Sequence, residues 1–321
     1  EILRCLVGSE MCIRDRLYDL TALQRDANRL LGYTAQQTLD YAQSLYEKHL
    51  LTYPRTDSRY LPQGMTEKAR ELAAYAAAAL PFAAGLSLPC HPRQLAGKVS
   101  DHHALLPTAA LRDHPLDALP AGERSVLTLV AARLLCAAGE ACVMLETTAR
   151  LECEGVSFTA RGRRTVHPGW KTLDAAFRAT LRSREREEEA DGLPPLNERM
   201  TFLPVTASVR EGKITPPERY SEDTLLSAME NAGKENTPKD AERRGLGTPA
   251  TRAAILEKLV AAGFVERKGK SLIPTKAGIN LVTVLPDTLT SPMLTAEWEQ
   301  KLTAIARGEG DPAAFMAGIS D

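Results

Sequence analysis

The apolar residues of this chain change their spacing twice, and that change limits the folds open to it. From Leu17 to about residue 145 they recur at the spacing of helix faces. Residues 146–214 instead alternate apolar and polar side chains and contain many β-branched residues, as strands do. Helical spacing returns over residues 215–321. The sequence therefore predicts a multi-domain α+β protein with a helical domain, a β-rich segment and a second helical segment.

Local signals predict the ends of several elements. In the first helical stretch Gly32 is typical of a C-cap, and Thr34 and Thr66 are typical of N-caps. The β-rich stretch predicts two strands joined at Glu154-Gly155. Further strand signals, with a turn at Gly212, follow over residues 201–217.

The last third predicts a helix, a hairpin and a second helix in succession. Thr248 is an N-cap residue, and Pro249 suits the first helical position. Two short apolar runs then flank a Lys268-Gly269-Lys270 turn. This order resembles a winged-helix element with a basic hairpin tip.

The composition excludes some classes of protein. The chain is 44% hydrophobic and 25% charged, and no apolar run approaches the length of a membrane span. A net charge of −1 gives no general attraction to nucleic acid, so local groups must hold any such partner. The six cysteines form no CxxC pair, which favours a reduced, cytosolic compartment. Cys136 and Cys142 lie in an apolar, helical run and are predicted to be small core residues.

Residues 1–16, EILRCLVGSEMCIRDR, do not fit the pattern that follows. They begin without Met, carry scattered charges and lack the basic start and apolar core of a signal peptide. We interpret them as a non-native leader in front of a truncated reading frame. The alternative is an ordinary N-terminal segment.

The stretch LTYPRTDSRYLP, residues 51–62, fits neither a buried strand nor a surface helix. Pro54 keeps the chain extended after Tyr53, and Asp57 and Ser58 can turn back on the backbone. The stretch therefore predicts an ordered loop with one phenol beside two guanidinium groups. A phenolate stabilised by these charges can attack a phosphodiester and conserve its bond energy in a phosphotyrosyl ester. The residues alone also allow a structural loop in which the tyrosine only packs.

A second polar group lies in SDHHALLPT, residues 100–108. His102 or His103 could bind a phosphate oxygen or pass a proton to a leaving hydroxyl. Two adjacent histidines also suggest a metal, but no Asp, Glu or Cys spacing completes a site. A loop with a purely structural role is the alternative.

Four stretches carry a family resemblance. They are, in chain order, TYPRTDSRYLP, DHHALLPT, ITPPERYSEDTLLSAMENAG and GLGTPATRAAILEKLVAAGFV. Together they resemble the type IA DNA topoisomerases, and Pro54 and the wording DHHALLPT are closer to bacterial topoisomerase III than to topoisomerase I. The resemblance extends over residues 17–305. It implies cleavage of one DNA strand by Tyr53, a 5′-phosphotyrosyl end, strand passage and resealing, which relaxes negative supercoils or decatenates.

The resemblance also implies roles for single residues. Tyr53 would be the nucleophile, Arg55 would hold the scissile phosphate and His102 would assist cleavage. The implied DNA-contacting residues are Asp57, Ser58, Arg59, Arg219, Thr248 and Arg252. Together with Glu218 and Tyr220, the residues Arg219, Thr248 and Arg252 would form a face that supports the tyrosine.

The family's architecture is a torus of four domains, some of which the chain visits twice. By resemblance, residues 17–145 would be the helical domain that carries the tyrosine and swings open. Residues 146–214 would be the returning part of a β-rich arch. Residues 215–321 would be the returning part of a base domain, with the winged-helix-like element inside it.

The chain departs from the family pattern at its start. Members begin with a Toprim domain whose Glu and DxD-type residues bind Mg²⁺ beside the tyrosine, and nothing before Leu17 resembles it. The resemblance therefore implies a whole enzyme that depends on Mg²⁺ and not on ATP. This chain is then expected to be a fragment, inactive or crippled by itself, that contributes no metal ligand.

Other expectations also follow from the family. Many topoisomerase I relatives carry Cys₄ zinc modules, and this sequence contains none. The implied partner is single-stranded DNA, with no membrane contact. The implied state is a monomer in the bacterial cytoplasm, at the nucleoid.

Two other interpretations stay open. A non-catalytic DNA-binding module could be built on the winged-helix-like stretch, but this leaves the order of the four stretches unexplained. Tyr53 could also serve a tyrosine recombinase or a relaxase. Those enzymes need a different Arg/His set or a histidine triad, and neither spacing occurs in the sequence.

Overall fold

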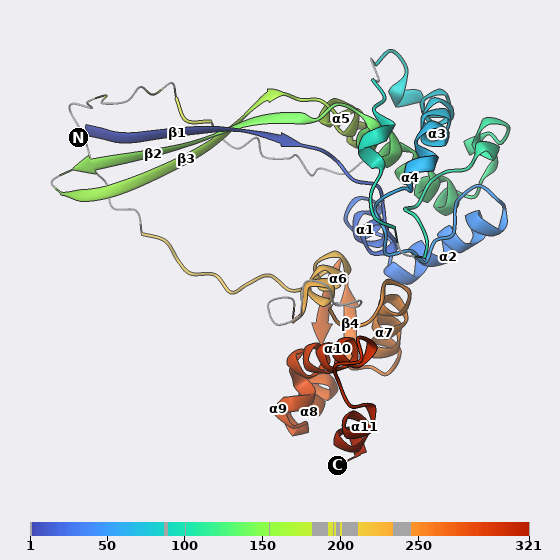
Figure 1. Ribbon diagram of the computed structural model, residues 1–321, viewed down its shortest axis with the longest axis vertical. Helices are drawn as coiled ribbons and strands as arrows, with labels where there is room; N and C mark the ends of the chain where they lie inside the picture. The colour runs from blue at the N-terminus through green and yellow to red at the C-terminus, as the bar shows by residue number, and fades with distance from the viewer. Residues whose placement is uncertain are drawn as a thin grey trace.

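The computed structural model describes residues 2–86, 89–99, 101–153, 155–181, 192–194, 196, 200, 211–233 and 245–320. It confirms the predicted α+β class. A helical block carries a long, projecting sheet, and a second group of helices lies beside the block (Figure 1). We call the described residues from Ser221 onward the base group.

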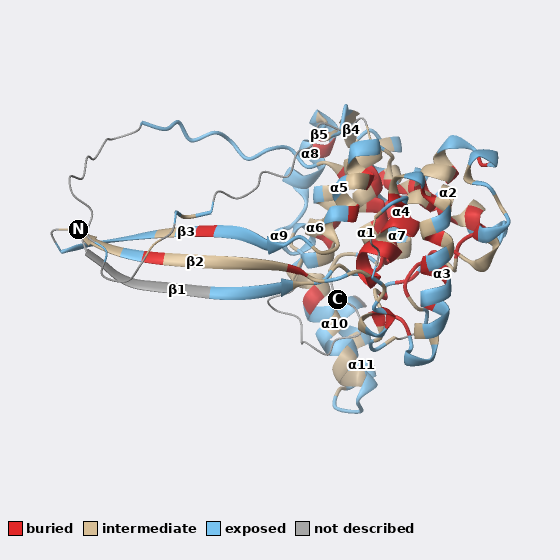
Figure 2. Ribbon diagram, turned by 90° about the horizontal axis from the view of Figure 1, so that it is seen from above, coloured by how far each residue is buried: buried red, intermediate tan, exposed pale blue. Residues whose placement is uncertain are grey.

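Four helices build the helical block. They are α1 (Leu20–Asp26), α2 (Ala35–Glu47), α3 (Thr66–Ala79) and α4 (Ala121–Ala138). A π-helical turn over Ala27–Leu31 follows α1, and short 3-10 turns cover Gln63–Met65, Pro81–Ala83, Pro92–Leu95, Ala109–Arg112 and Leu116–Ala118. Helix α4 is buried on most of its circumference because its apolar residues are not confined to one stripe. Figure 2 shows the buried residues, in red, concentrated in this block.

The predicted caps are confirmed at two of three positions in the block. Gly32 ends the π-helical turn with a φ of 74°, a conformation that glycine adopts without steric cost. At the start of α2, the Gln37 backbone N–H donates to Thr34 Oγ1 at 3.1 Å, and the Thr34 N–H donates to Gln37 Oε1 at 2.9 Å. The prediction for Thr66 is wrong, because Thr66 is the first helical residue and Met65 holds the N-cap position.

The prediction that Cys142 lies in a helix is also wrong. Helix α4 ends at Ala138, Gly139 adopts an extended backbone, and a strand begins at Cys142. Both Cys136 and Cys142 are buried, as expected of small core residues. Burial raises the pKa of the Cys136 thiol, which keeps it protonated.

Three long strands form an antiparallel sheet in the order β1-β2-β3. Strand β1 (Ile2–Ile13) pairs with β2 (Cys142–Cys153), which pairs with β3 (Val156–His167). The predicted turn between β2 and β3 is confirmed at Gly155, whose φ is 79°. The sheet projects from the block, and most of its described side chains are exposed or half-buried (Figure 2). The segment interpreted as a leader, residues 1–16, thus contains β1, and its non-native origin stays a prediction.

Helix α5 (Lys171–Thr180) follows β3 and is missing from the sequence prediction. Leu173 and Phe177, one helical turn apart, are buried, and the Phe177 ring lies 5.4 Å from the Phe82 ring. This spacing is the local sign of a helix face. The alternating apolar and polar residues of β3 lie directly before α5. They made the change from strand spacing to helix spacing hard to recognise in the sequence.

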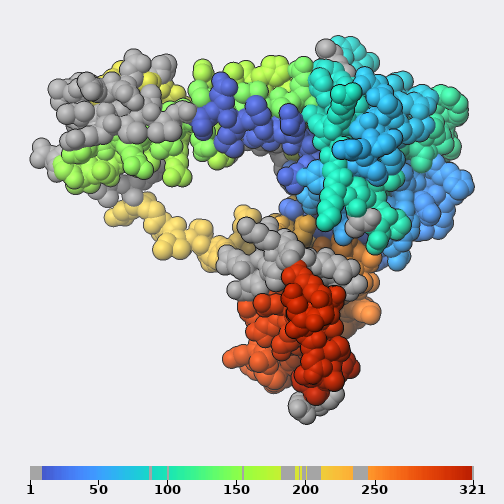
Figure 3. All heavy atoms as spheres, in the orientation of Figure 1, coloured from blue at the N-terminus to red at the C-terminus, as the bar shows by residue number. Residues whose placement is uncertain are grey.

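The strands predicted over 201–217 are not found. Residues 201–210 lie outside the described residues, and residues 211–217, with the predicted turn at Gly212, have no regular secondary structure. In Figure 3 the sheet, the helical block and the base group border an opening, and residues 211–220 run along one side of it.

The base group contains six helices and one hairpin among its described residues. They are α6 (Glu222–Asn231), α7 (Pro249–Ala261), β4 (Val265–Lys268), β5 (Ser271–Pro274), α8 (Lys276–Val284), α9 (Asp287–Thr290), α10 (Met293–Ala306) and α11 (Pro312–Ser320). The predicted order of helix, hairpin and helix is present as α7, β4–β5 and α8. No helix in the described ranges combines the length and the apolar character needed to cross a membrane.

Gly278 in α8 offers a test of the packing between this helix and the hairpin. A Cβ atom at Gly278 would lie 2.2 Å from the carbonyl oxygen of Phe264, which also accepts a 3.0 Å hydrogen bond from the Thr275 N–H. We expect Gly278→Ala to lower the free energy of unfolding by about 1–3 kcal/mol in urea denaturation, because the backbone must shift to admit the methyl group.

The matched control is Gly318→Ala in α11, where a Cβ atom would have no neighbour within 4 Å. This substitution should be neutral or slightly stabilising, since alanine favours helix more than glycine does. Equal unfolding midpoints for the two variants would contradict the packing argument.

Candidate active site at the tyrosine loop

The tyrosine loop, residues 51–62, is anchored by pairing with the segment that follows the two histidines. Leu51 forms an antiparallel bridge with Pro107. The Thr52 N–H donates to the Leu106 carbonyl at 3.0 Å, and the Leu106 N–H donates back to Thr52 Oγ1 at 2.9 Å. The stretches LTYPRTDSRYLP and SDHHALLPT therefore lie side by side.

The middle of the loop is held by Thr56, which is buried. Its hydroxyl donates to the His102 carbonyl at 3.1 Å, and its own carbonyl accepts a 3.0 Å hydrogen bond from the Leu20 N–H at the start of α1. Further on, the Ala104 N–H donates to the Tyr60 carbonyl at 3.0 Å. These bonds are made by backbone groups and by a small hydroxyl, so they order the middle of the loop without a charged side chain.

This scaffold brings Tyr53 and His102 into contact. Their ring centroids are 4.5 Å apart with the planes tilted by 46°, and Tyr46 of α2 packs edge-on against Tyr53 at 5.5 Å. Tyr53 is half-buried and His102 is exposed. The phenol and the imidazole thus share one site that solvent can reach.

Arg55 and Asp57 project from the same loop and are exposed. Arg55 makes no hydrogen bond or ion pair with any other described residue, so its guanidinium is available to an anion beside Tyr53.

Arg59 and Ser58 make contacts that hold the loop in place, and their roles as DNA contacts stay predictions. Arg59 Nε lies 2.5 Å from Asp19 Oδ2, and Arg59 Nη2 lies 3.4 Å from Glu230 Oε1 of α6. Asp19 is buried and caps α1; burial raises the pKa of its carboxyl and the charge of Arg59 opposes that rise. The Ser58 hydroxyl is buried and donates to the Tyr60 carbonyl at 3.3 Å. Neither side chain faces solvent freely.

The three predicted DNA contacts of the second helical segment lie in different surroundings. Arg219 is exposed in the irregular segment, next to Glu218 and Tyr220, and makes no hydrogen bond or ion pair within the described part of the chain. Thr248 caps α7, where its N–H donates to Thr251 Oγ1 at 2.9 Å. Arg252 is only 2% exposed.

Arg252 instead joins the base group to the helical block. It donates to Thr21 Oγ1 of α1 at 3.0 Å and to the carbonyls of Leu246 and Gly247 at 3.1 Å each. Burial lowers the pKa of its guanidinium, although Glu230 and Asp19 oppose that shift. Arg252 therefore ties the start of α7 to α1, its guanidinium is buried in this conformation, and its role as a DNA contact stays a prediction.

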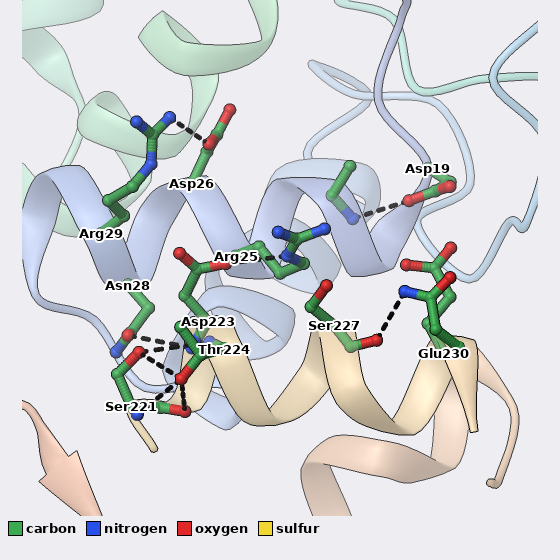
Figure 4. Close-up of polar contacts among 12 residues, drawn as sticks. Asp19, Arg25, Asp26, Asn28, Arg29, Ser221, Asp223, Thr224, Ser227 and Glu230 are labelled. Carbon is green, nitrogen blue, oxygen red and sulfur yellow. Dashed lines mark hydrogen bonds and ion pairs between the residues drawn. The ribbon is translucent and has the colours of Figure 1, made fainter. Parts of the chain in front are cut away.

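Sequence reasoning missed most of the contacts that α6 makes with the helical block, of which Figure 4 shows those to α1 and to the π-helical turn after it. Arg25 Nε lies 2.7 Å from Asp223 Oδ1, and the Asp223 N–H donates to Asn28 Oδ1 at 3.2 Å. Glu222 accepts from the first N–H of α2. The acidic pair Glu222-Asp223 was visible in the sequence only as a helix start, because nothing local indicates its distant partners.

Within the described ranges no group of three or more His, Cys, Asp or Glu side chains could hold a metal ion. The Mg²⁺ implied by the resemblance therefore stays an expectation. The groups that Tyr53, His102 and Arg55 supply are a phenol, an imidazole and a guanidinium.

The model of a protein family described as DNA topoisomerase matches residues 9–317 of the chain. The chain belongs to the DNA topoisomerase family. This membership confirms the resemblance that the four stretches carried. The chain is 39% identical over 318 residues to DNA topoisomerase 3 of Bacillus subtilis, with 94% of this chain and 43% of the relative covered. It is 38% identical over 331 residues to DNA topoisomerase 3 of Bacillus licheniformis, with 95% and 43% covered.

The chain spans less than half of the length of these two relatives. The full-length topoisomerase I of Thermotoga maritima has a similar fold, with a TM-score of 0.67 and 21% sequence identity over 99% of this chain and 50% of that one. Because the match covers 99% of this chain, the helical block, the sheet and the base group together have the fold of a type IA topoisomerase.

Proposed function

We propose that the whole protein to which this chain belongs is a type IA DNA topoisomerase of the topoisomerase III kind. It cuts one DNA strand, lets another strand pass and reseals the cut, and so relaxes negative supercoils or decatenates. Its partner is single-stranded DNA, and we propose that it acts as a monomer at the bacterial nucleoid.

In this proposal Tyr53 Oη attacks a backbone phosphorus atom. An O–P bond forms to the tyrosine, the bond from phosphorus to the 3′ oxygen breaks, and that oxygen leaves as a 3′-hydroxyl. The phenol loses its proton in the first event, and the leaving oxygen gains one in the second; His102 is placed to assist this transfer. Arg55 offsets the charge on the phosphate oxygens. Attack by the 3′-hydroxyl on the phosphotyrosyl ester reverses each step without ATP.

The observation that carries the proposal is the contact between Tyr53 and His102. Two polar stretches separated in the sequence meet at a ring distance of 4.5 Å, beside an exposed arginine on the same loop. Packing alone does not require an exposed imidazole against a half-buried phenol. Asp57, Arg219 and Thr248 are proposed DNA contacts on weaker grounds. Magnesium enters only as an expectation of the resemblance, because the described residues offer no group to hold it.

The test is the polarity of the covalent adduct. The whole protein is incubated with a single-stranded oligonucleotide labelled at either its 3′ or its 5′ end and is then denatured. A 5′-phosphotyrosyl link retains the downstream fragment, so we expect labelled protein from the 3′-labelled strand and none from the 5′-labelled strand. Adducts labelled only from the 5′ end, or no adduct at all, would contradict the proposal.

The alternative function, a non-catalytic winged-helix module, has one observation in its favour and one against it. The order α7, β4–β5, α8 agrees with it. However, the basic tip of the hairpin is engaged, because Lys270 Nζ donates to the Arg29 carbonyl of the helical block at 2.8 Å. A hairpin held in this way is less available to a DNA groove.

A further inference from the structure

The carboxylate of Glu222 joins two parts of the chain that are 187 residues apart. Its Oε2 accepts a hydrogen bond from the Ala35 N–H at 2.6 Å, and its Oε1 accepts one from Arg267 Nε at 2.8 Å. The side chain belongs to the first turn of α6 and is buried. A buried carboxylate is costly unless its oxygens have partners, and here both have one.

The Ala35 N–H is one of the donors that helix α2 cannot satisfy internally. The first N–H groups of a helix have no intrahelical acceptor. Thr34 and Gln37 satisfy two N–H groups at this end through their capping box, and Glu222 satisfies the Ala35 N–H from the base group. A negative charge at a helix N-terminus is also favoured by the helix dipole. Docking of the base group therefore completes the start of α2.

Helix α2 connects this capped end to the tyrosine. It has 13 residues, and so it is about 20 Å long. At its far end Tyr46 packs edge-on against Tyr53 with the centroids 5.5 Å apart. A second link runs from α6 through Glu230 to Arg59 in the tyrosine loop, at 3.4 Å. A shift of α2 therefore moves the ring against which Tyr53 packs.

We infer that Glu222 is a positioning residue for the reaction at Tyr53. By capping α2 from the base group, it makes the placement of the tyrosine depend on whether the base group is docked. This inference rests on the proposed function. It adds a residue that touches neither DNA nor the reacting atoms.

The surface around Glu222 combines a small apolar cluster with polar contacts. Its apolar part is a small cluster of Ala35, Leu226, Met229, Ala253 and Leu256. Polar contacts such as that between Arg25 and Asp223 make up much of the rest, and these groups can be hydrated when the surfaces part.

Arg267 keeps Glu222 aligned within the base group itself. Besides Glu222, it binds Glu257 through Nη1 at 3.2 Å and Nη2 at 2.6 Å. The Glu222 carboxylate is therefore already oriented by Arg267 within the base group, and docking only has to bring the start of α2 to it.

The test variant is Glu222→Gln. The Ala35 N–H and Arg267 Nε bind different oxygens of Glu222, and an amide places an NH₂ donor group where one of those oxygens lies. The charged Arg267 favours the remaining oxygen, so the Ala35 N–H is the donor expected to lose its acceptor. The matched control is Glu123→Gln. Glu123 is also a buried carboxylate that binds α2, through Ser44 at 2.9 Å and Lys48 at 2.5 Å, but it lies inside the helical block.

The first measurement is hydrogen exchange of the peptide over residues 34–40 in the chain itself, without DNA. We expect exchange there to be about tenfold faster in Glu222→Gln than in Glu123→Gln. Amides of α4 serve as the folding control and should stay protected in both variants. Unchanged exchange at 34–40 in Glu222→Gln would overturn the inference.

The second measurement uses the whole protein. We expect Glu222→Gln to slow single-turnover cleavage of an oligonucleotide about tenfold, with its Kd for that oligonucleotide unchanged. The control for this measurement is Glu257→Gln, which changes the other carboxylate bound to Arg267 inside the base group and should cleave at the wild-type rate. Equal cleavage rates for these two variants would overturn the positioning role. If the wild-type protein forms no adduct, the proposed function is wrong, and so is the positioning role that rests on it. If only the exchange result disagrees, the capping role of Glu222 is wrong and the proposed function is unaffected.

Discussion

Tyr53→Phe is expected to abolish the covalent attachment of DNA, with a loss of cleavage of at least about 10⁴-fold. The substitution removes the attacking oxygen and nothing else. The phenyl ring can still pack against Tyr46 and His102, which lie 5.5 Å and 4.5 Å from the Tyr53 ring. The backbone bonds that order the loop are also untouched. Binding of single-stranded DNA should therefore stay within about twofold of the wild type.

The control for this experiment is Tyr60→Phe. Tyr60 lies in the same loop, and its ring packs where a side chain on Gly97 would otherwise lie. Its substitution removes a phenol oxygen but leaves Tyr53 and its contact with His102 in place, so adduct formation should persist. Both quantities are measured in the whole protein, the adduct by gel shift after denaturation and the affinity by fluorescence anisotropy. Adduct formation by Tyr53→Phe would show that another residue is the nucleophile, and loss of adduct in both variants would indicate that the loop is damaged.

Arg133→Met is expected to lower the free energy of unfolding by about 3–5 kcal/mol. The guanidinium of Arg133 on α4 lies 2.5 Å from Asp26 Oδ2 and 2.5 Å from Asp15 Oδ1. It also lies 4.5 Å from the centre of the Tyr18 ring and donates to the Tyr18 hydroxyl at 3.0 Å. Methionine fills a similar volume but leaves the buried carboxylates without their main counter-charge.

The effect of Arg133→Met should depend on pH with a definite sign. Burial by itself would raise the pKa of Asp26, but the charges of Arg133 and Arg29 outweigh it, so the pKa lies below the ordinary value of 3.8. In the wild type, Asp26 thus stabilises the fold above pH 3.8, and this contribution is lost as the pH falls through the lowered pKa. Without Arg133, burial dominates and the pKa of Asp26 rises above 3.8. The variant then gains stability as the pH falls toward 3.8.

In the Arg133→Met variant the pKa of Asp15 should change in the same direction as that of Asp26. Burial already raises its pKa above 3.8 in the wild type, and Arg133 opposes that rise. The difference in stability between wild type and variant should therefore narrow between pH 7 and about pH 4.5, as measured by urea denaturation at both values. The control is Arg163→Met on β3, whose exposed ion pair with Glu146 should contribute less than about 1 kcal/mol at either pH. A constant or widening difference would contradict the assignment of charge at Asp26.

Features that depend on neighbouring residues were predictable from the sequence alone. The cap at Gly32, the capping box at Thr34 and the turn at Gly155 follow from the conformations that these residues prefer. The same holds for the α7, β4–β5, α8 order and for the α+β class. The composition of the tyrosine loop also suggested the chemistry that we propose for it. In all of these cases the physical cause acts within a few residues along the chain.

Local rules failed where an element's end depends on its surroundings. Helix α4 stops at Ala138 although the apolar run continues, and α5 forms because Leu173 and Phe177 find a buried place in the helical block. Thr66 was misassigned for a similar reason, because the preceding 3-10 turn leads directly into α3. A helix boundary is decided by a balance of small energies that packing can reverse.

The sequence by itself determined which residues are proposed to carry the chemistry, and the tertiary structure alone decided which of them meet. Tyr53 and His102 are in contact because the backbone near Thr52 pairs with Leu106, and no local signal encodes that pairing. Arg252, predicted from its motif to contact DNA, is buried against Thr21, and Glu222, which no motif singled out, caps α2 from the base group. The physical reason is that a side chain's charge and shape are local, whereas its partners are chosen by the burial of apolar surface from distant parts of the chain.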